Sequence, residues 1–252
     1  MATIYYEDEG LARLLDSELR GFTLSRAREK LSLLEAAGVA PAGELLDVGC
    51  SSGAWLEVAQ GAGWAGSGVE LGERFASRAR DKGLEVHTGT FEGAARSVLS
   101  GRSFDLITFW DVLEHLDDPL GALELARGLL APGGTVALTA PNVDGLYPRL
   151  TYRLLARPSG VWEYPEMPAH LYDFSPRTAA LLMRRAGLAP ASVTTTEVPF
   201  QYYRETSLRN QLAPRGRRGR ALRWGFEAVR AFAYPLARMT DRGNALFMTA
   251  RR

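Results

Sequence analysis

Residues 44–71, ELLDVGCSSGAWLEVAQGAGWAGSGVEL, decide the fold class of this 252-residue chain. The apolar run at 44–48 predicts a strand, residues 53–60 predict the start of a helix, and 66–71 predicts a second strand. A strand, a helix and a strand in such short succession are typical of a βαβ unit, in which the two strands run parallel.

The same alternation continues toward the C-terminus. It predicts further strands at 85–88, 104–109 and 134–139, with helices up to Arg80 and over 119–130. Apolar strands alternating with amphipathic helices predict an α/β fold with a doubly wound parallel sheet and helices on both faces. Two later strand-like runs, 193–200 and 244–250, could pair with each other.

We expect a single domain over residues 1–252, with N-terminal helices predicted by the helical periodicity of 11–38. A further helix is expected over 175–187, with Ser175 as its N-cap. The segments are N-terminal helices at 1–43, a ligand-binding core at 44–141, a lid or acceptor segment at 142–173, and a C-terminal half at 174–252 that contains a basic helical insertion at about 201–242.

The composition is that of a globular protein. Hydrophobic residues make up 46% of the chain, and 30 basic residues nearly balance 29 acidic ones, which excludes a disordered or collagen-like chain. Cys50 is the only cysteine, so no internal disulfide can form. The acidic N-terminal sequence lacks the layout of a signal peptide, so we expect a cytoplasmic protein, with peripheral membrane contact as a second option.

A glycine-containing loop, DVGCSSG, follows the first predicted strand. Glycines at 49 and 53 allow a ligand close to the backbone, but the G-x-G-x-x-G pattern of dinucleotide sites is missing because Ser51 stands at its middle glycine. Asp47 precedes the turn, and its carboxylate suits an amine or a sulfonium while it repels a pyrophosphate. Glu70 closes the second strand about 20 residues later, where it is placed to accept both hydroxyls of a ribose. The alternative for Glu70 alone is an ordinary surface acid, but the two features together favour nucleoside binding.

Four segments in this order resemble the class I S-adenosylmethionine-dependent methyltransferases. They are LLDVGCSSGAWL, GVEL, FDLITFWDVLEHLDDP and LLAPGGTVALTAPN. HLYDFSPRTAALLMRRAGL is similar to a segment of the branch that contains the ubiquinone-biosynthesis O-methyltransferases, which have a methyltransferase domain of type 11 or 23. The resemblance covers residues 44–188 and the final strand, and implies a Rossmann-like sheet of seven strands with the last one antiparallel. Ser51 departs from the glycine that most members have.

The resemblance also implies which residues hold S-adenosylmethionine, the expected cofactor. It assigns the methionine part to Asp47 and the loop, the ribose to Glu70, and the adenine to the loop after the third strand, where Phe91 is either a stacking ring or a core aromatic. The expected cofactor residues are Asp47, Gly49, Cys50, Ser51, Gly53, Glu70, Leu71, Thr90, Phe91, Glu92, Trp110 and Asp111.

Methyl transfer to a hydroxyl needs a base near the acceptor, and histidine has a suitable pKa. His115 and His170 are the candidates, with capping or packing as the alternative for His115, whereas His87 within the third strand is expected to be structural or exposed. Asp111, Glu114 and His115 have the i, i+3, i+4 spacing of one helical face. Some ubiquinone-branch enzymes ligate a divalent metal with acids here, but we expect no metal, because Asp111 replaces their usual glutamate.

Two other segments bear on the partner. The lid is rich in aromatic residues, which suits an aromatic, sugar or lipid-linked acceptor or forms an ordinary hydrophobic cap. Its aromatics are Tyr147, Tyr152, Trp162, Tyr164 and Tyr172. The basic segment 215–238 predicts an amphipathic helix that caps the domain, forms a homodimer or lies on a membrane surface; we expect no nucleic acid partner. Its arginines at 215, 217, 218 and 220 precede an apolar face of Leu222, Phe226, Val229 and Phe232 and a polar face of Arg223, Glu227 and Arg230.

The function expected from these features is O-methylation of a small-molecule or lipid-linked hydroxyl acceptor by in-line displacement, with a histidine base. One alternative is a C- or N-methyltransferase acting on a sugar, a glycan or a natural-product intermediate. The alternative without catalysis is a cofactor-binding scaffold that acts through its basic C-terminal segment.

Overall fold

The fold is built on one seven-stranded sheet, seen in a computed structural model that describes residues 20–160, 162, 170–197 and 216–252. The strand order is β3-β2-β1-β4-β5-β7-β6, and β7 runs antiparallel to both of its neighbours. This confirms the predicted Rossmann-like α/β sheet with an antiparallel last strand. The strands are β1 (Glu44–Val48), β2 (Ala65–Glu70), β3 (Glu85–Thr88), β4 (Phe104–Trp110), β5 (Leu130–Pro141), β6 (Ala189–Thr196) and β7 (Ala245–Arg251).

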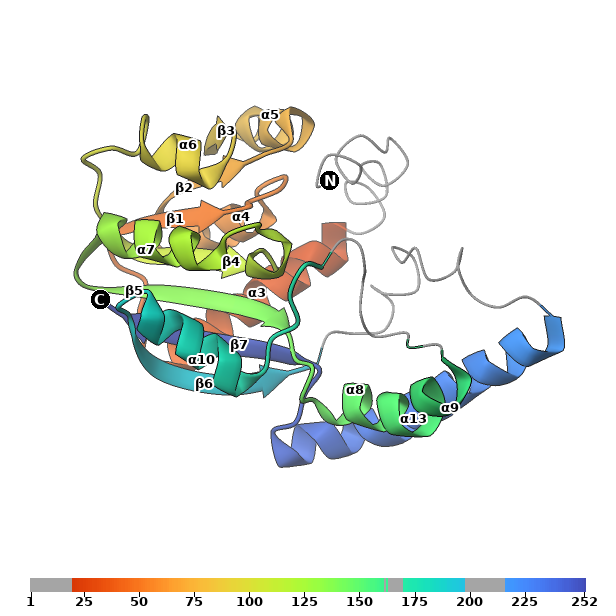
Figure 1. Ribbon diagram of the computed structural model, residues 1–252. Helices are drawn as coiled ribbons and strands as arrows, with labels where there is room; N and C mark the ends of the chain where they lie inside the picture. Colours follow the sequence, from red (N-terminus) through yellow and green to blue (C-terminus); the bar gives the residue numbers. More distant parts are fainter. Residues whose placement is uncertain (1–19, 161, 163–169, 198–215) are drawn as a thin grey trace.

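Helices cover both faces of the sheet (Figure 1). One hydrophobic core joins the sheet to α6, α7 and α10, and a second core on the other face joins it to α3, α4 and α5. β1 and β4 lie in the middle of the sheet and are buried except for one residue each, so apolar residues on both of their faces enter the two cores. The helices are α3 (Arg20–Ala36), α4 (Ala54–Gly61), α5 (Glu73–Asp81), α6 (Phe91–Ala95), α7 (Pro119–Leu129) and α10 (Pro176–Arg185).

Local sequence signals account for most of these boundaries. The predicted strands 44–48 and 85–88 coincide with β1 and β3. Ser175 caps α10 as predicted: its hydroxyl accepts a hydrogen bond from the backbone N–H of Thr178, whose hydroxyl receives one from the Ser175 N–H. The predicted N-terminal helix is confirmed from residue 20 onward, and its first part lies outside the described residues.

The prediction of a strand at 193–200 was wrong at its start. β6 begins at Ala189, and Pro190 lies in it at a register shift. Proline is tolerated there because β6 is an edge strand, where a missing backbone N–H costs no ladder hydrogen bond. Residues 198–200 lie outside the described part of the chain.

Two helical segments far apart in the sequence pack together as an arm beyond the sheet (Figure 1). The first consists of α8 (Leu146–Thr151), the π-helical turn η3 (Tyr152–Ala156) and α9 (Arg157–Ser159), and the second is α13 (Gly216–Thr240). The lid is therefore partly core, because Tyr147 is buried with its ring edge-on to Tyr234 at 5.7 Å between centroids.

The predicted faces of α13 were also partly wrong. Arg230, expected on the polar face, is 7% exposed, and Phe232, expected on the same apolar face as Phe226, is 65% exposed while Phe226 is buried. Arg230 is accommodated because it donates hydrogen bonds to Glu227 at 2.8 Å and to the Tyr147 hydroxyl at 3.0 Å. Among the described residues, no helix is long and apolar enough to cross a membrane.

Candidate active site

The loop after β1 is held tightly against β2. The backbone N–H groups of Gly49 and Cys50 both donate to the Val69 carbonyl, at 2.8 and 3.1 Å. Gly49 has φ 74°, and a Cβ there would come within 2.7 Å of Val112, so only glycine fits. Ser51 adopts the left-handed conformation with φ 48°, which explains why glycine is the common residue at this position.

Cys50 itself faces the core. Its side chain is buried, and burial raises the pKa of the thiol, so the group stays protonated. A Cβ added to Gly68 of β2 would lie 2.5 Å from the Cys50 sulfur. Cys50 therefore contributes to the loop through its backbone, while its side chain packs in the core.

Glu70 lies at the carboxyl end of β2 and organises the same loop. Its two carboxylate oxygens accept hydrogen bonds from the backbone N–H of Ser51 at 2.8 Å and of Gly72 at 2.7 Å. Burial raises its pKa, and these backbone hydrogen bonds counteract the rise. A carboxylate has about four lone-pair positions, so Glu70 keeps capacity for two further donors such as ribose hydroxyls. Leu71, which follows it, is exposed.

Asp47 is buried near the end of β1 and accepts a hydrogen bond from the Thr108 hydroxyl of β4 at 2.6 Å. Burial raises its pKa to about 7, while the Thr108 hydrogen bond and the charge of Lys30 oppose the rise. The carboxylate is thus poorly solvated, and a cationic group bound beside it would be strongly favoured.

We expect Asp47→Asn to stabilise the protein at pH 8 by a few kcal/mol and to have no effect near pH 4. The unfolded carboxyl has a pKa of about 3.9. Because the folded value is higher, ionisation disfavours the folded state, and the stability of the wild type falls as pH rises from about 4 to 7. Urea unfolding at several pH values measures the difference. Asp81→Asn, which changes an exposed acid, is the control. The explanation is contradicted if Asp47→Asn stabilises the protein equally at pH 4 and at pH 8.

Lys30 on α3 is a candidate that the sequence reasoning missed. Its ammonium nitrogen lies 5.1 Å from the centroid of the Trp110 ring, and Asp111 and Asp47 act on it through their charges. Desolvation lowers the pKa of Lys30, and these two acids oppose the decrease. One signal was visible in the sequence, since Lys30 is one of only two lysines in a chain that otherwise uses arginine.

Trp110 and Asp111 end β4 beside the glycine loop. The Trp110 ring packs edge-on against Trp55 at 5.3 Å and stacks on Phe247 at 6.3 Å. Asp111 has φ 58° and accepts a hydrogen bond from the Thr139 hydroxyl of β5 at 2.9 Å. The strained backbone of Asp111 is thus fixed by a neighbouring strand.

The loop after β3 also contacts Glu70, because the Gly89 N–H donates to the Glu70 backbone carbonyl at 2.9 Å. Thr90 uses its hydroxyl to cap α6. Phe91 is buried in the core with its ring edge-on to Phe109 at 5.7 Å, as expected of a core aromatic. Glu92 is exposed and forms an ion pair with Arg96 at 2.8 Å.

His115 and His170, 55 residues apart, are neighbours. Their ring centroids are 4.8 Å apart, in an edge-to-face arrangement. The backbone brings them together, since the N–H groups of Leu171 and Tyr172 both donate to the Glu114 carbonyl, at 2.8 and 3.3 Å. His115 lies three residues after Val112, and a Cβ added to Gly49 in the loop after β1 would lie 2.7 Å from the Val112 side chain.

The expected helical face of Asp111, Glu114 and His115 was wrong. Leu113–His115 is a single 3-10 turn, η2, that begins after Asp111, and Asp111 is directed to Thr139 instead. His170 takes its place: among the residues described, Glu114, His115 and His170 offer ligand atoms that all lie within 4.8 Å of one another. These three are the side chains that could hold a divalent cation there.

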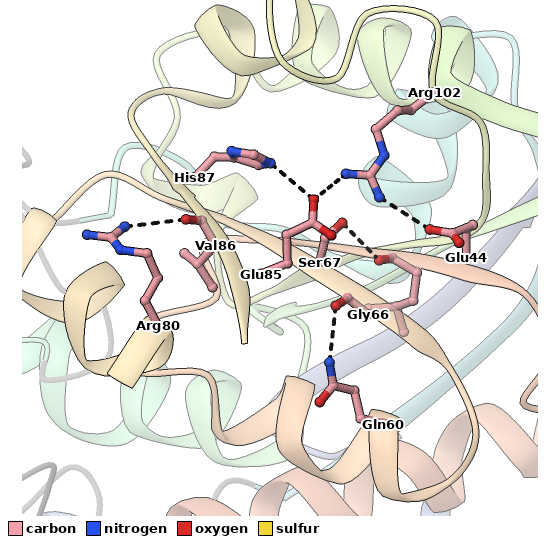
Figure 2. A network of polar contacts seen from close by, with 10 residues as sticks. Glu44, Gln60, Gly66, Ser67, Arg80, Glu85, Val86, His87 and Arg102 are labelled. Atoms are coloured by element: carbon pink, nitrogen blue, oxygen red, sulfur yellow. Dashed lines mark hydrogen bonds and ion pairs between the residues drawn. The ribbon is translucent and has the colours of Figure 1, made fainter. Parts of the chain in front are cut away.

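His87 lies elsewhere, in a polar network at the edge of the sheet (Figure 2). Its Nε2 is 3.3 Å from a Glu85 oxygen that also pairs with Arg102 at 2.5 Å. Arg102 in turn reaches Glu44 at 3.2 Å and thus links β3 to β1. The expectation of a structural role for His87 is consistent with this network.

The donor set at the carboxyl ends of β1, β2 and β4 fits S-adenosylmethionine. Glu70 offers oxygens for the ribose, Asp47 and Asp111 offer negative charge for the amino and sulfonium groups, and Lys30 offers positive charge for the carboxylate. The space beside Gly89 is open, because a Cβ built there meets no atom within 4 Å. The loop begins beside the Asp47 carboxylate and does not have the G-x-G-x-x-G pattern of dinucleotide sites.

The lid aromatics do not act as one group. Tyr147 is buried against α13, whereas the Tyr152 and Trp162 rings pack on each other at 5.0 Å. Tyr172 stacks on Phe174 at 6.3 Å and donates its hydroxyl to the Asp117 carbonyl at 3.1 Å. Tyr164 lies outside the described residues.

Comparisons with known proteins show the family of the chain. A methyltransferase domain family matches residues 17–193. A ubiquinone biosynthesis O-methyltransferase of Thiobacillus denitrificans is 28% identical over 160 residues, which cover 60% of this chain and 66% of that relative, just under two thirds of its length.

Two solved structures show the same fold. A S-adenosylmethionine-dependent methyltransferase from Archaeoglobus fulgidus has a TM-score of 0.60 at 17% identity and covers 97% of this chain and 100% of its own. Magnesium protoporphyrin IX methyltransferase from Synechocystis, with bound S-adenosylhomocysteine, has a TM-score of 0.61 at 15% identity and covers 99% and 97%. These two likenesses show the fold of S-adenosylmethionine-dependent methyltransferases. Because the family match extends over residues 17–193, most of the chain, this protein belongs to the methyltransferase domain family.

Proposed function

We propose that the protein methylates a hydroxyl group of a small-molecule or lipid-linked acceptor, with one of the paired histidines as the base. The observation that carries the proposal is the His115–His170 pair, 4.8 Å between centroids, beside the end of β4. The relatives named as ubiquinone biosynthesis O-methyltransferases support hydroxyl as the acceptor group. S-adenosylmethionine, when bound, supplies a methyl group on a positively charged sulfur.

In this proposal the residues around the glycine loop bind and orient the cofactor. Glu70 accepts the ribose hydroxyls while it keeps its two backbone hydrogen bonds, so loop and ribose are fixed by one carboxylate. Asp47 holds the amino group. Phe91 supports the adenine loop from the core rather than by stacking, because its ring already contacts Phe109.

The histidines take the proton of the acceptor hydroxyl. His170, half-buried, accepts the proton, and exposed His115 orients its ring and passes the proton to solvent. Glu114 is buried beside them, and its carboxylate lies within 4.8 Å of a ring nitrogen of each histidine. We propose that the site acts without a metal, although the same three side chains could hold one.

An acceptor screen tests the proposal. Purified protein is incubated with isotope-labelled S-adenosylmethionine and matched acceptors that differ in one group: a phenol, the corresponding aniline, and a sugar with free hydroxyls. Transfer to the hydroxyl of the phenol or of the sugar, and not to the aniline nitrogen, supports O-methylation. Transfer to the aniline or to carbon favours the N- or C-methyltransferase, and cofactor binding without any product favours the scaffold.

We expect Lys30→Met to weaken S-adenosylmethionine binding roughly 10–100-fold and to leave the binding of decarboxylated S-adenosylmethionine unchanged. The physical reason is that the Lys30 ammonium, held over Trp110, would pair with the cofactor carboxylate, and the decarboxylated ligand has none. Calorimetric titration with both ligands measures the two affinities. Arg28→Met, at an exposed position of the same helix, is the matched control, and equal weakening of both ligands would exclude the carboxylate contact.

A further inference from the structure

Helix α13 has a second apolar face that points away from α8 and η3, the segments on which it packs. Its packed face is formed by the buried residues Phe226, Arg230, Ala233 and Ala237. On the opposite side, Trp224 is 76% exposed and Met239 83% exposed, with Phe232 beside them. The outward face consists of Ala221, Trp224, Ala228, Ala231, Phe232, Pro235 and Met239, all exposed and at helical spacing.

Arginines border this outward face. Arg217, Arg220 and Arg223 are exposed along its first two turns, and Arg238 lies near its end. Glu227 is the only acidic residue within the sequence of the helix. It is paired with Arg230, so it does not neutralise the outer arginines.

We propose that the outward face of α13 docks on an anionic lipid membrane. Aromatic and methionine side chains enter the boundary between head groups and acyl chains, and the flanking arginines bind lipid phosphates. The helix lies in the plane of the membrane, since it is not apolar enough to span it. The inference goes beyond the methyltransferase activity and does not depend on the identity of the acceptor.

The charges favour a membrane over a second copy of this chain. In a symmetric dimer through this face, the arginines of one helix would meet those of the other. The single acid of the helix, Glu227, is already paired with Arg230 and so does not offset them. A lipid surface supplies the opposite charge. The flanking of a continuous apolar stripe by arginine also differs from nucleic acid sites, where the basic groups contact a polar backbone.

Vesicle sedimentation tests the proposal with the full-length protein. We expect binding to vesicles of phosphatidylcholine mixed with phosphatidylglycerol, little binding to phosphatidylcholine alone, and a decrease with added salt. Trp224→Ala, Phe232→Ala and Met239→Ala combined should lower the partition coefficient about a hundredfold or more. Arg217→Gln, Arg220→Gln and Arg223→Gln combined should lower it by about a hundredfold, at roughly fivefold for each arginine.

Matched controls use similar side chains on other surfaces. Val98→Ala with Leu181→Ala removes exposed apolar groups, and the triple change of Arg177, Arg184 and Arg185 to Gln removes exposed charge on α10; both should bind vesicles like the wild type. Titration with S-adenosylmethionine checks that each variant is folded.

A spectroscopic measurement gives an independent answer. Lipids brominated in their acyl chains should quench the fluorescence of Trp224, and Trp224→Phe should abolish that quenching while the variant still binds vesicles. The proposal is overturned if the wild-type protein does not bind anionic vesicles. It is equally overturned if the triple apolar variant and the triple arginine variant both bind them as the wild type does. It is also overturned if sedimentation equilibrium without lipid shows a dimer that the Trp224 variant loses, because the face then serves a second copy.

Discussion

Glu70→Ala is expected to lower the affinity for S-adenosylmethionine roughly 10²–10⁴-fold. Each hydrogen bond to a charged group contributes about 1.5–3 kcal/mol, and the carboxylate is positioned to accept two from the ribose. It also accepts from the backbone of Ser51 and Gly72, so its loss releases the glycine loop. Calorimetric titration with S-adenosylmethionine and S-adenosylhomocysteine measures the change.

Two controls separate direct contact from a loosened loop. Glu73→Ala removes an exposed acid three positions later and should bind like the wild type. The wild type should bind a cofactor analogue that lacks the ribose 2′-hydroxyl more weakly than S-adenosylmethionine. This difference in affinity should be smaller in Glu70→Ala. Equal discrimination in both proteins would mean that Glu70 acts only on the loop, and wild type that binds neither ligand would overturn the cofactor assignment.

We expect His170→Gln to lower the rate of methyl transfer about 10²–10⁴-fold, the usual effect of removing a general base, with little change in cofactor affinity. His115→Gln should have a smaller effect, because His115 orients His170 and passes the proton on to solvent but does not take it from the acceptor. The measurement is single-turnover transfer to the best acceptor of the screen, recorded against pH. His87→Gln, in the polar network at the sheet edge, is the control.

The pH profile and a chelator distinguish the chemical roles of this pair. A base gives a rate that rises with pH to a plateau, and the rise should disappear in His170→Gln. Activity that survives EDTA supports the base. Activity that EDTA abolishes and a divalent cation restores would assign Glu114, His115 and His170 to a metal instead. Unchanged rates in both histidine variants would leave proximity as the source of catalysis.

Local rules of the sequence predicted the sheet and the glycine loop after β1. Strands β1 and β3 were predicted at their exact bounds, because glycines lie close to both ends of each strand. The glycine loop and Glu70 could be proposed as one site because they lie at the ends of strands that are adjacent in sequence and parallel in space. Ser175 caps its helix through contacts within four residues, which spacing reveals, whereas the cap at Thr90 was not predicted.

The sequence by itself determined the α/β class, the strand positions and the acids at the strand ends, since each depends on neighbours within one βαβ unit. Only the tertiary structure decided which distant side chains meet. It brought His170 to His115, Lys30 to Trp110 and Arg230 to Tyr147, across 55, 80 and 83 residues. It also turned Phe232 outward. These contacts depend on how separate elements pack. Helical periodicity predicts the faces of α13, but it does not tell which of the two apolar faces packs against α8 and η3.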